Sequence, residues 1–525
     1  MFVWLILFSA PLDCGALDAM AFRSIEDRRD YIDSLAEADH EGTITLMRKA
    51  LGCPSEQTRM FAAEALGYLD DPGAIPALIA ALKSPSIGVR YETAWALGLL
   101  GDTSALTPLI DALSDRAVPV RTNAAWALGE IADARAIDAL LKALEDVDRR
   151  VRENATEALG KLKSKEAVPI FLKRVASLSG SERNRTLAAL AKIADHRATG
   201  VLAQAATDPA VPDRHLIAQA LGRIGDTTAV ETLLKLLDDS RWAVRAKAAL
   251  SLGMLKDKRA VKPLQTKATD KKSEVRQAAS EALGRIGDIQ SEDVLISGLE
   301  DENDLCVMAA AHALGLLGSR KALEPLIELM SDPEPPVREQ VAFALGAIGD
   351  PTAASALRSR LKDVSWEVQQ EAVTSIGWLR DVSSIDALRG VLAHKFWSIR
   401  LAGVQALGLI GVSKALPLIR RRFADAHPDV RRWGYVVAAK LGADPEATLA
   451  GLNKENPSPE MLEVARILTA KKESLSAWNG DLTQERLQLL VLLGTDDARA
   501  MLESLPLPRD ELELSELRLI ALRNW

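Results

Sequence analysis

Cysteine and histidine, from which metal sites and many catalytic centres are built, are scarce in this sequence. The 525 residues include three cysteines and six histidines. Three cysteines exclude a disulfide-rich scaffold and a zinc site of the CxxC type. The phosphate-loop pattern GxxxxGK(S/T), the nucleophile pattern GxSxG and the zinc pattern HExxH do not occur. The sequence therefore predicts no catalytic residue, no metal and no cofactor.

Aromatic residues and an excess of basic charge are also lacking. Aromatics make up 4% of the chain, although Trp (10) is commoner than Phe (8) or Tyr (4). The 48% of hydrophobic residues are therefore mostly small or aliphatic, which suits the close packing of helices. A net charge of −8 disfavours nucleic-acid binding, which normally depends on a basic surface. We expect no nucleic-acid partner.

The sequence has no long hydrophobic run. The apolar residues 2–10 are too few for a transmembrane helix, which needs about 20. Residues 1–21 fit a secretory signal peptide with a cleavage site at Ala19-Met20-Ala21, although no Lys or Arg precedes the run. Asp13 disfavours a lipoprotein signal at Cys14, and a start of translation at Met20 is the alternative. The protein is exported in the first case and cytoplasmic in the last.

An arginine recurs every 31 residues through most of the chain. Eleven of the thirteen positions in this register are Arg: 59, 90, 121, 152, 183, 214, 245, 276, 338, 400 and 431, with Val307 and Gln369 as the exceptions. A glycine follows eight residues later in eleven of the thirteen units, as at Gly98 and Gly129. A fixed period without insertions indicates structural units of equal length stacked one on the next.

Each unit is predicted to contain two helices. In residues 102–131, Asp102 is a suitable N-cap, and Leu106, Leu109, Ile110 and Leu113 recur at the spacing of a first helix, A. A second helix, B, is expected from about Val118 to Ile131. Because Gly129 has no side chain, a neighbouring helix can approach it closely.

The repeated Arg and Asp residues are predicted to form a structural ladder. The aspartates that follow each helix B share one register, and we expect the arginines to bond to them and to turn carbonyls between neighbouring units. A residue repeated in every unit does not specify a single binding site. The ladder includes Arg90, Arg121, Arg152, Arg245, Arg276, Asp102, Asp133, Asp226 and Asp288.

Cys53 and Cys306, the two cysteines outside the possible signal peptide, and two of the histidines are predicted to have no special role. Cys53 and Cys306 lie about eight units apart, on the order of 80 Å for helices stacked at ~10 Å, so each is expected to be a free thiol. An intermolecular bridge stays open if the protein is exported. His215 and His312 are three units apart, so they cannot share a metal and are expected to be ordinary surface residues.

The repeat resembles a known family. The motif VRxxAAxALGxxGD, seen at 89–102 (VRYETAWALGLLGD), 275–288 (VRQAASEALGRIGD) and 337–350 (VREQVAFALGAIGD), resembles HEAT-like repeats of the phycobilisome-lyase type. The resemblance implies an all-α, right-handed α-solenoid of about thirteen 31-residue repeats, with the B helices on its concave face. It covers about residues 42–445 and weakens at 183–195 and beyond 440.

The same pattern predicts the domain organisation. We expect capping helices at 22–58, the solenoid at 59–445, and degenerate helical repeats at 446–525, with a break in the pattern at 453–460.

The helix B positions that do not repeat are predicted to carry the function. They lie one, two, five and nine residues after the arginine register and fall on one face of the helix, which we call the variable face. Exposed aromatic residues there are typical of protein contacts. The predicted partner-binding residues are Phe61, Tyr68, Tyr91, Trp95, Leu99, Trp126, Arg185, Arg223, Lys247, Arg285, Phe343, Trp378 and Trp433.

Two parts of this set, the N-terminal aromatics and the central cations, have an alternative interpretation. The N-terminal cap can fold back over the first aromatics, and the central cations can belong to a mixed solvated face. Trp242, Trp366 and Trp397 lie where helix B begins, and we expect them to plug the turn between helices A and B.

The leading functional prediction is a non-catalytic scaffold, monomeric or partner-bound, that binds a protein or peptide. A bilin lyase or lyase subunit, which the resemblance suggests, is the first alternative, and a nucleic-acid-binding HEAT-like protein is the second.

Overall fold

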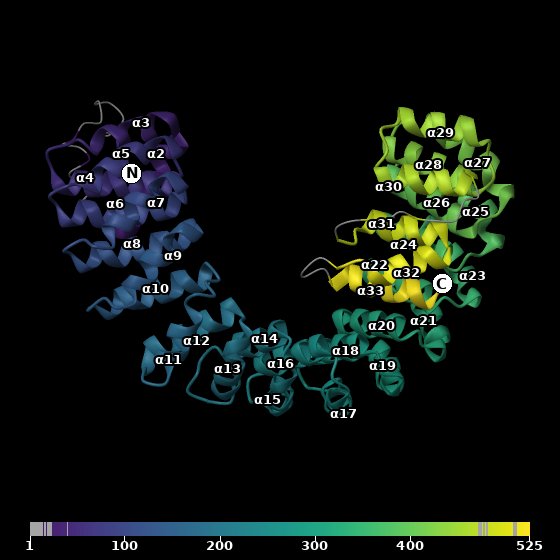
Figure 1. Cartoon of the computed structure of the whole chain (residues 1–525), viewed down its shortest axis with the longest axis horizontal. Helices are drawn as coiled ribbons and strands as arrows, with labels where there is room; N and C mark the ends of the chain where they lie inside the picture. The colour runs from purple at the N-terminus through teal and green to yellow at the C-terminus, as the bar shows by residue number, and fades with distance from the viewer. Residues whose placement is uncertain are drawn as a thin grey trace. The chain divides into compact units, whose positions relative to one another are not determined.

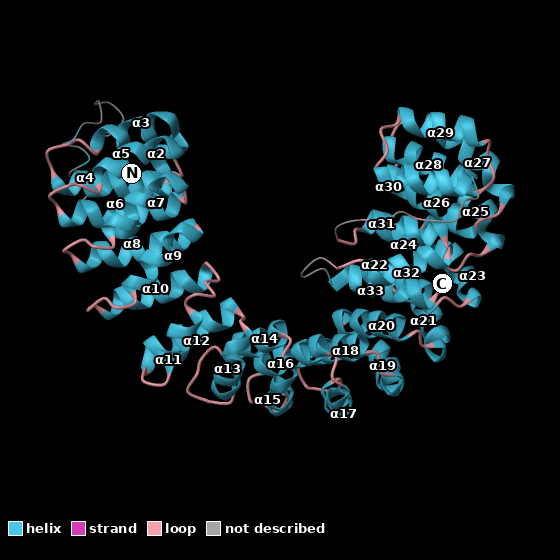
Figure 2. Cartoon of the chain, in the orientation of Figure 1, coloured by secondary structure: helices cyan, strands magenta, loops and turns pink. Residues whose placement is uncertain are grey.

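Helices are the only regular secondary structure in the part of the chain that the computed structural model describes (Figure 2). That part comprises residues 14, 17, 24–38, 40–470, 475, 478, 481–507 and 512–525. The helices come in consecutive packed pairs, as the 31-residue period predicted. Within the same residues, no helix is both long and apolar enough to cross a membrane.

Long B helices alternate with short A helices. The B helices are α4 (Glu56–Tyr68), α6 (Ile87–Leu100), α8 (Val118–Ile131), α10 (Arg149–Lys161), α12 (Gly180–Ile193), α14 (Arg214–Ile224), α16 (Trp242–Leu255), α18 (Ser273–Ile286), α20 (Asp304–Leu317), α22 (Pro335–Ile348), α24 (Trp366–Trp378), α26 (Trp397–Ile410) and α28 (Pro428–Lys440). The A helices are α5 (Ile75–Ala81), α7 (Leu106–Ala112), α9 (Ile137–Ala143), α11 (Val168–Val175), α13 (Thr199–Ala206), α15 (Val230–Leu236), α17 (Val261–Lys267), α19 (Glu292–Ser297), α21 (Leu323–Leu329), α23 (Ala354–Ser359), α25 (Ile385–Val391) and α27 (Leu416–Arg420).

Further helices flank these pairs at both ends. Two precede them, α2 (Ile25–Ala38) and α3 (His40–Ala50), and five follow: α29 (Pro445–Lys454), α30 (Pro459–Ala470), α31 (Gln484–Leu493), α32 (Asp496–Ser504) and α33 (Leu512–Arg523). The break predicted at 453–460 contains the link between α29 and α30.

The chain divides into two compact units, one ending at Leu236 and the other beginning at Leu237 (Figure 1). In the first unit, each B helix from α4 to α14 packs against the next. In the second unit, the same is true from α16 to α28. Each unit is therefore a stack of two-helix repeats with its own core.

The repeat boundaries follow from local backbone chemistry. Helix α8 has the predicted bounds, Val118–Ile131. Helix α6 ends at Gly101, whose φ of 64° lies in the left-handed region that glycine enters without strain. Asp102 then accepts a hydrogen bond from the Ser104 backbone N–H at 2.7 Å and caps the 3-10 turn that leads into α7. Asp133, Asp226 and Asp288 cap their turns in the same way.

The repeated glycine lets neighbouring B helices touch. A methyl group placed on Gly129 would lie 2.8 Å from the Ala158 Cβ of the next B helix, and one on Gly284 would lie 2.7 Å from the Ala313 Cα. No real Cβ tolerates such distances, so the glycine sets the spacing of the stack. The close approach predicted at Gly129 is confirmed.

The arginine ladder uses a different aspartate from the one predicted. Arg90 forms a bidentate pair with Asp115, at 2.7 and 2.9 Å, and donates to the carbonyl of Ser84 at 2.8 Å. Asp102 is not its partner. The equivalent pairs are Arg121–Asp146, Arg245–Asp270, Arg276–Asp301, Arg338–Asp363 and Arg400–Asp425, while Arg152 pairs with Glu182. Each of these arginines fastens its own A–B turn to the next unit. The Asp102 series caps the turns before the A helices, and where its members form ion pairs they use other arginines, as Asp133 does with Arg135.

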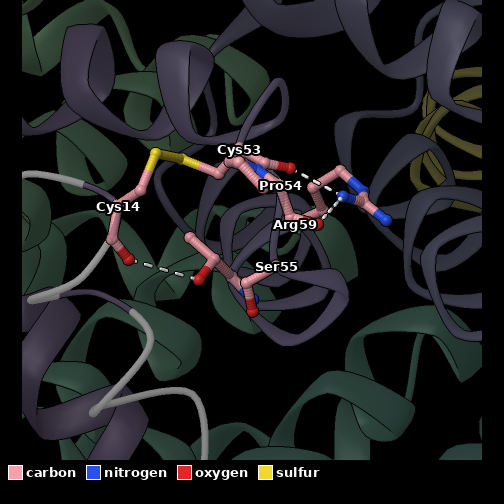
Figure 3. Close-up of a disulfide and its surroundings, with 6 residues drawn as sticks. Cys14, Cys53, Pro54, Ser55 and Arg59 are labelled. Atoms are coloured by element: carbon pink, nitrogen blue, oxygen red, sulfur yellow. Dashed lines mark hydrogen bonds between the residues drawn. A yellow bond between two sulfur atoms is a disulfide. The ribbon is translucent and has the colours of Figure 1, made fainter.

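Cys53 is bonded rather than free. A disulfide joins it to Cys14, with 5.8 Å between the two Cα atoms, and the carbonyls of Cys53 and Pro54 accept hydrogen bonds from Arg59 (Figure 3). The prediction failed because Cys14 was assigned to a removable leader. The proposed cleavage site at residues 19–21 lies outside the described residues. Cys306 is a free thiol as predicted, and burial raises its pKa to about 11.

Candidate binding surfaces

An aromatic row lies on the variable face of the first unit. We use this name for Tyr68, Tyr91, Trp95, Leu99 and Trp126, which come from α4, α6 and α8. The Tyr68 and Trp95 rings meet edge to face with centroids 5.1 Å apart. A methyl group placed on Gly98 would lie 2.6 Å from the Trp126 indole, so Trp126 covers that glycine. Leu99 is 40% exposed, and the other four side chains are partly exposed.

Part of the predicted N-terminal site is covered by the capping helix α2. Phe61 is only 1% exposed, and its ring centroid lies 6.4 Å from that of Tyr31. The guanidinium of Arg29 lies 5.0 Å from the Tyr68 ring centroid. Phe61 is therefore a core residue, because the cap folds over α4 as the alternative interpretation had it. The five residues of the aromatic row stay at least partly exposed.

A partly buried carboxyl, that of Glu92, lies beside the aromatic row. Burial and the neighbouring Glu64 raise the pKa of Glu92 to about 7. Glu64 is itself held by Arg28, with Arg28 Nε 2.8 Å from the Glu64 Oε2. Glu92 thus lies next to Tyr91 of the aromatic row, and its charge is only partly compensated, since the Arg28 cation is bonded to Glu64.

The central cations mostly bind groups of the same chain. Arg185 pairs with Glu157 at 2.7 Å, and Arg223 donates to the Ala191 carbonyl at 3.1 Å. Arg285 lies 3.6 Å from Glu281. Lys247 lies on the same face and is partly exposed. Because most of these cations are bonded within the chain, the central part of the variable face is a mixed polar surface.

The variable face of the second unit is largely covered by the C-terminal helices. Ile520 of α33 packs with Leu316 and Ala347, and Phe343 and Trp378 pack against the same cluster. Trp433 is only 4% exposed. Trp433 is therefore buried, whereas Phe343 and Trp378 pack against the Ile520 cluster and stay partly exposed, and the sequence pattern did not predict this packing.

A pocket of about 670 Å³ remains on this face, between α24, α26, α28 and the helices α31 and α33. Its aromatic lining comes from Phe343, Trp378, Trp397, Trp433 and Trp525. Its polar lining includes Gln370, whose buried Oε1 has no hydrogen-bond partner, and Glu371. Burial raises the pKa of Glu371 to about 8, and the nearby Glu339 and Glu513 add to the shift.

The tryptophans at the start of helix B do not plug the A–B turn. Trp242, Trp366 and Trp397 are 42%, 44% and 43% exposed. Trp366 meets Phe396 edge to face at 5.8 Å, and Trp397 stacks on His427 at 3.8 Å. The turn is held instead by the ladder arginine, so these indoles lie on the surface.

Metal ligands do not gather anywhere in the described part of the chain. No group of three or more His, Cys, Asp or Glu side chains there could hold a metal ion. His312, predicted to be an ordinary surface residue, is partly buried and lies 2.8 Å from Glu516.

Comparison with known families agrees with this architecture. The profile of HEAT repeats matches residues 18–98, 44–125, 106–191, 198–284, 235–315, 267–340, 292–366, 323–402 and 359–440. This chain belongs to the HEAT-repeat family. The matches stop at 440 and are interrupted between 191 and 198, close to where the motif was expected to weaken.

Two structures of Kap95p show the same fold. Yeast importin-beta (Kap95p) is 12% identical over 99% of this chain and 82% of its own, with a TM-score of 0.52. Kap95p in a structure with RanGDP is 13% identical over 97% and 80%, with a TM-score of 0.55. The CpcE–CpcF complex of phycocyanin lyase from Nostoc sp. PCC7120 is 24% identical over 46% and 94%, with a TM-score of 0.32. No curated protein matches the sequence.

Proposed function

We propose that this HEAT-repeat protein is a non-catalytic scaffold that binds a protein or peptide through the aromatic row of its first unit. The observation that carries the proposal is the position of Tyr91, Trp95 and Trp126. These large side chains come from two successive B helices and stay partly exposed, whereas the register of Trp95 and Trp126 holds Glu64, Glu157 and Gln219 in other repeats of the same unit. Trp and Tyr are the side chains that most often dominate binding energy at protein interfaces.

Glu92 gives the proposed surface a preference for partner charge. Its carboxyl is partly buried next to Tyr91 in the sequence, with a pKa raised to about 7 by burial and by Glu64. A Lys or Arg of a partner would stabilise the ionised carboxylate, whereas an acidic residue would destabilise it. The expected partner segment therefore combines an apolar anchor with a basic residue.

Two further observations support a protein partner. The central cations are bonded to Glu157, to the Ala191 carbonyl and to other groups of the chain, which does not favour a nucleic-acid partner. Kap95p, which shares the fold, occurs in a structure with another protein, RanGDP, and this supports the proposal by analogy of fold.

The test uses one tryptophan of the row and a matched tryptophan elsewhere. Peptides selected from a random library against the full chain are titrated against Trp95→Ala and Trp242→Ala. Trp95→Ala should weaken binding by about tenfold or more, as for an interface hot spot. Trp242 is 42% exposed in the other unit, so Trp242→Ala should bind like the wild type.

Thermal melts of both variants separate binding from folding. Equal affinity of the selected peptides for Trp95→Ala and for the wild type would refute the proposed site. Trp126→Ala is a weaker test, because Trp126 also covers Gly98 and its loss leaves a gap.

A further inference from the structure

Helix α33 lies against repeats that precede it by more than 170 residues. It contacts α20, and its side chains reach the ends of both α20 and α22 (Figure 1, yellow beside teal and green). All these elements belong to the second unit. The B helices beneath α33 already pack against one another, so their stack does not depend on it.

One end of the contact is electrostatic. The Oε2 atom of Glu516 is hydrogen-bonded to His312 Nε2 at 2.8 Å. The other ring nitrogen of His312, Nδ1, is hydrogen-bonded to Gln340 Nε2 at 3.0 Å. Arg285 Nε lies 3.6 Å from Glu516 Oε1. Burial alone would raise the pKa of Glu516, but His312 and Arg285 hold it below its usual range. The groove therefore favours a carboxylate at this point.

The other end of the contact uses the carboxyl ends of two B helices. Arg523 donates to the carbonyls of Gly315 and Leu316 in the last turn of α20, at 2.9 Å for Gly315. Asn524 donates to the Ala347 carbonyl in the last turn of α22 at 3.2 Å. Carbonyls in the last turn of a helix lack full intrahelical partners and carry partial negative charge. This end of the groove therefore favours a cation or an amide.

Between these ends the groove is apolar. Ile520 is fully buried against Leu316 and Ala347. Glu516, Ile520, Arg523 and Asn524 follow the spacing i, i+4, i+7 and i+8, which places them on one face of a helix. The groove is thus complementary to a helix that carries an acidic residue, an apolar residue four positions later, and Arg and Asn at its end.

The fit of α33 to this groove is incomplete. Arg285 Nε is buried with no hydrogen-bond partner, because 3.6 Å is too long for a bond to Glu516. A buried donor without a hydrogen-bond partner destabilises the packed state. Leu519 on α33 is 49% exposed. A helix whose carboxylate reached Arg285 would therefore bind this groove better than α33 does.

We propose that the groove over α18, α20 and α22 is a binding site for one helix of a partner protein, and that α33 is a built-in competitor for it. The partner helix carries the pattern that α33 displays: Glu or Asp, an apolar residue four positions on, and Arg three positions after that. This site extends the proposed scaffold role to a second surface and shares no residue with the aromatic row.

The test uses a labelled peptide of residues 512–525 and a full-length variant whose own helix is released. Glu516→Lys together with Arg523→Glu removes the electrostatic contacts at both ends of α33 in the full chain. The peptide should bind this released variant at least about tenfold more tightly than the wild type, because α33 no longer competes for the groove. Adding His312→Ala to the released variant should abolish binding, and a peptide with the same two charge reversals should bind neither chain.

Equal binding to the wild type and the released variant, or binding to neither, would overturn the proposal. If the released variant loses its helical circular dichroism, hydrogen exchange of the wild type replaces it. Excess unlabelled peptide should then speed exchange of the α33 amides, and unchanged exchange would overturn the proposal as well. Trp95→Ala leaves this groove intact, so failure of the aromatic-row test would not produce these results.

Discussion

Arg338 and Asp363 form the most enclosed ion pair of the arginine ladder. Arg338 Nη2 lies 2.6 Å from Asp363 Oδ1, and the two side chains are 7% and 3% exposed. A second contact joins Arg338 Nε to Asp363 Oδ2 at 2.9 Å, and Arg338 Nη1 donates to the Asp332 carbonyl at 2.7 Å. One guanidinium therefore fixes two successive A–B turns, so the ladder connects repeats that would otherwise meet only through their helices.

Arg338→Ala should destabilise the second unit strongly. The substitution leaves the Asp363 carboxylate buried without its cation, and breaking one side of a buried pair costs about 3–5 kcal/mol. The measurement is the midpoint of chemical unfolding followed by circular dichroism. The matched control is Arg135→Ala, which removes a guanidinium that is 68% exposed in its pair with Asp133. That exposed pair should contribute less than about 1 kcal/mol. Equal losses in the two variants would contradict a structural role for the ladder.

The repeat architecture was predictable because its signals are local and periodic. Gly129, the Asp102 cap and the bounds of α8 follow from residues within one 31-residue unit and its neighbour. The pairing of the ladder was not predictable by the same means. Asp102 and Asp115 both belong to series that repeat every 31 residues, so periodicity alone does not tell which of them reaches Arg90.

The exposure of the predicted site residues was harder to predict, because it depends on segments that are distant in the sequence. Phe61 has the helical register of an exposed residue, but α2 covers it. Phe343 and Trp378 pack against the cluster that contains Ile520, a contact between segments more than 140 residues apart. No local pattern encodes such a contact. Tyr91, Trp95 and Trp126 of the aromatic row stay partly exposed.

Gly253→Ala should lower stability although alanine favours helices. A methyl group at Gly253 would lie 2.7 Å from the Ala282 Cα and 2.9 Å from its Cβ, so α16 and α18 would have to separate. Overpacking of this kind costs about 1–3 kcal/mol. Gly390→Ala in α25 is the control, since nothing lies within 4 Å of the added methyl. It should be neutral or should stabilise by up to about 1 kcal/mol, from the better helix propensity of alanine. Gly253→Ala should therefore lower the midpoint of chemical unfolding, whereas Gly390→Ala should leave it unchanged or raise it.

The number of cysteines that react with a thiol reagent should rise in two steps, first on unfolding and then on reduction. In protein prepared under oxidising conditions, Cys14 and Cys53 are joined and Cys306 is buried, so the folded chain should react with no equivalent of a thiol reagent. Unfolding without a reductant should expose one thiol, and unfolding with a reductant should expose all three cysteines. Cys306→Ser should abolish the first step only. A reactive Cys53 in the folded, oxidised chain would contradict the disulfide.

Glu371→Gln should make the stability of the second unit less dependent on pH. Burial, with help from Glu339 and Glu513, raises the pKa of Glu371 to about 8, so the folded chain holds a proton there that the unfolded chain releases near its ordinary value of 4.5. The folded state then binds more protons between these values, and stability must fall as pH rises toward 8. Between about pH 6 and about pH 9 the wild type should lose roughly 2–3 kcal/mol that Glu371→Gln keeps. Chemical unfolding at the two pH values measures this difference, with Glu485→Gln, an exposed carboxyl of the same pocket, as the control for loss of a surface charge. An equal loss in Glu371→Gln and in the wild type would show that Glu371 is ionised throughout that range.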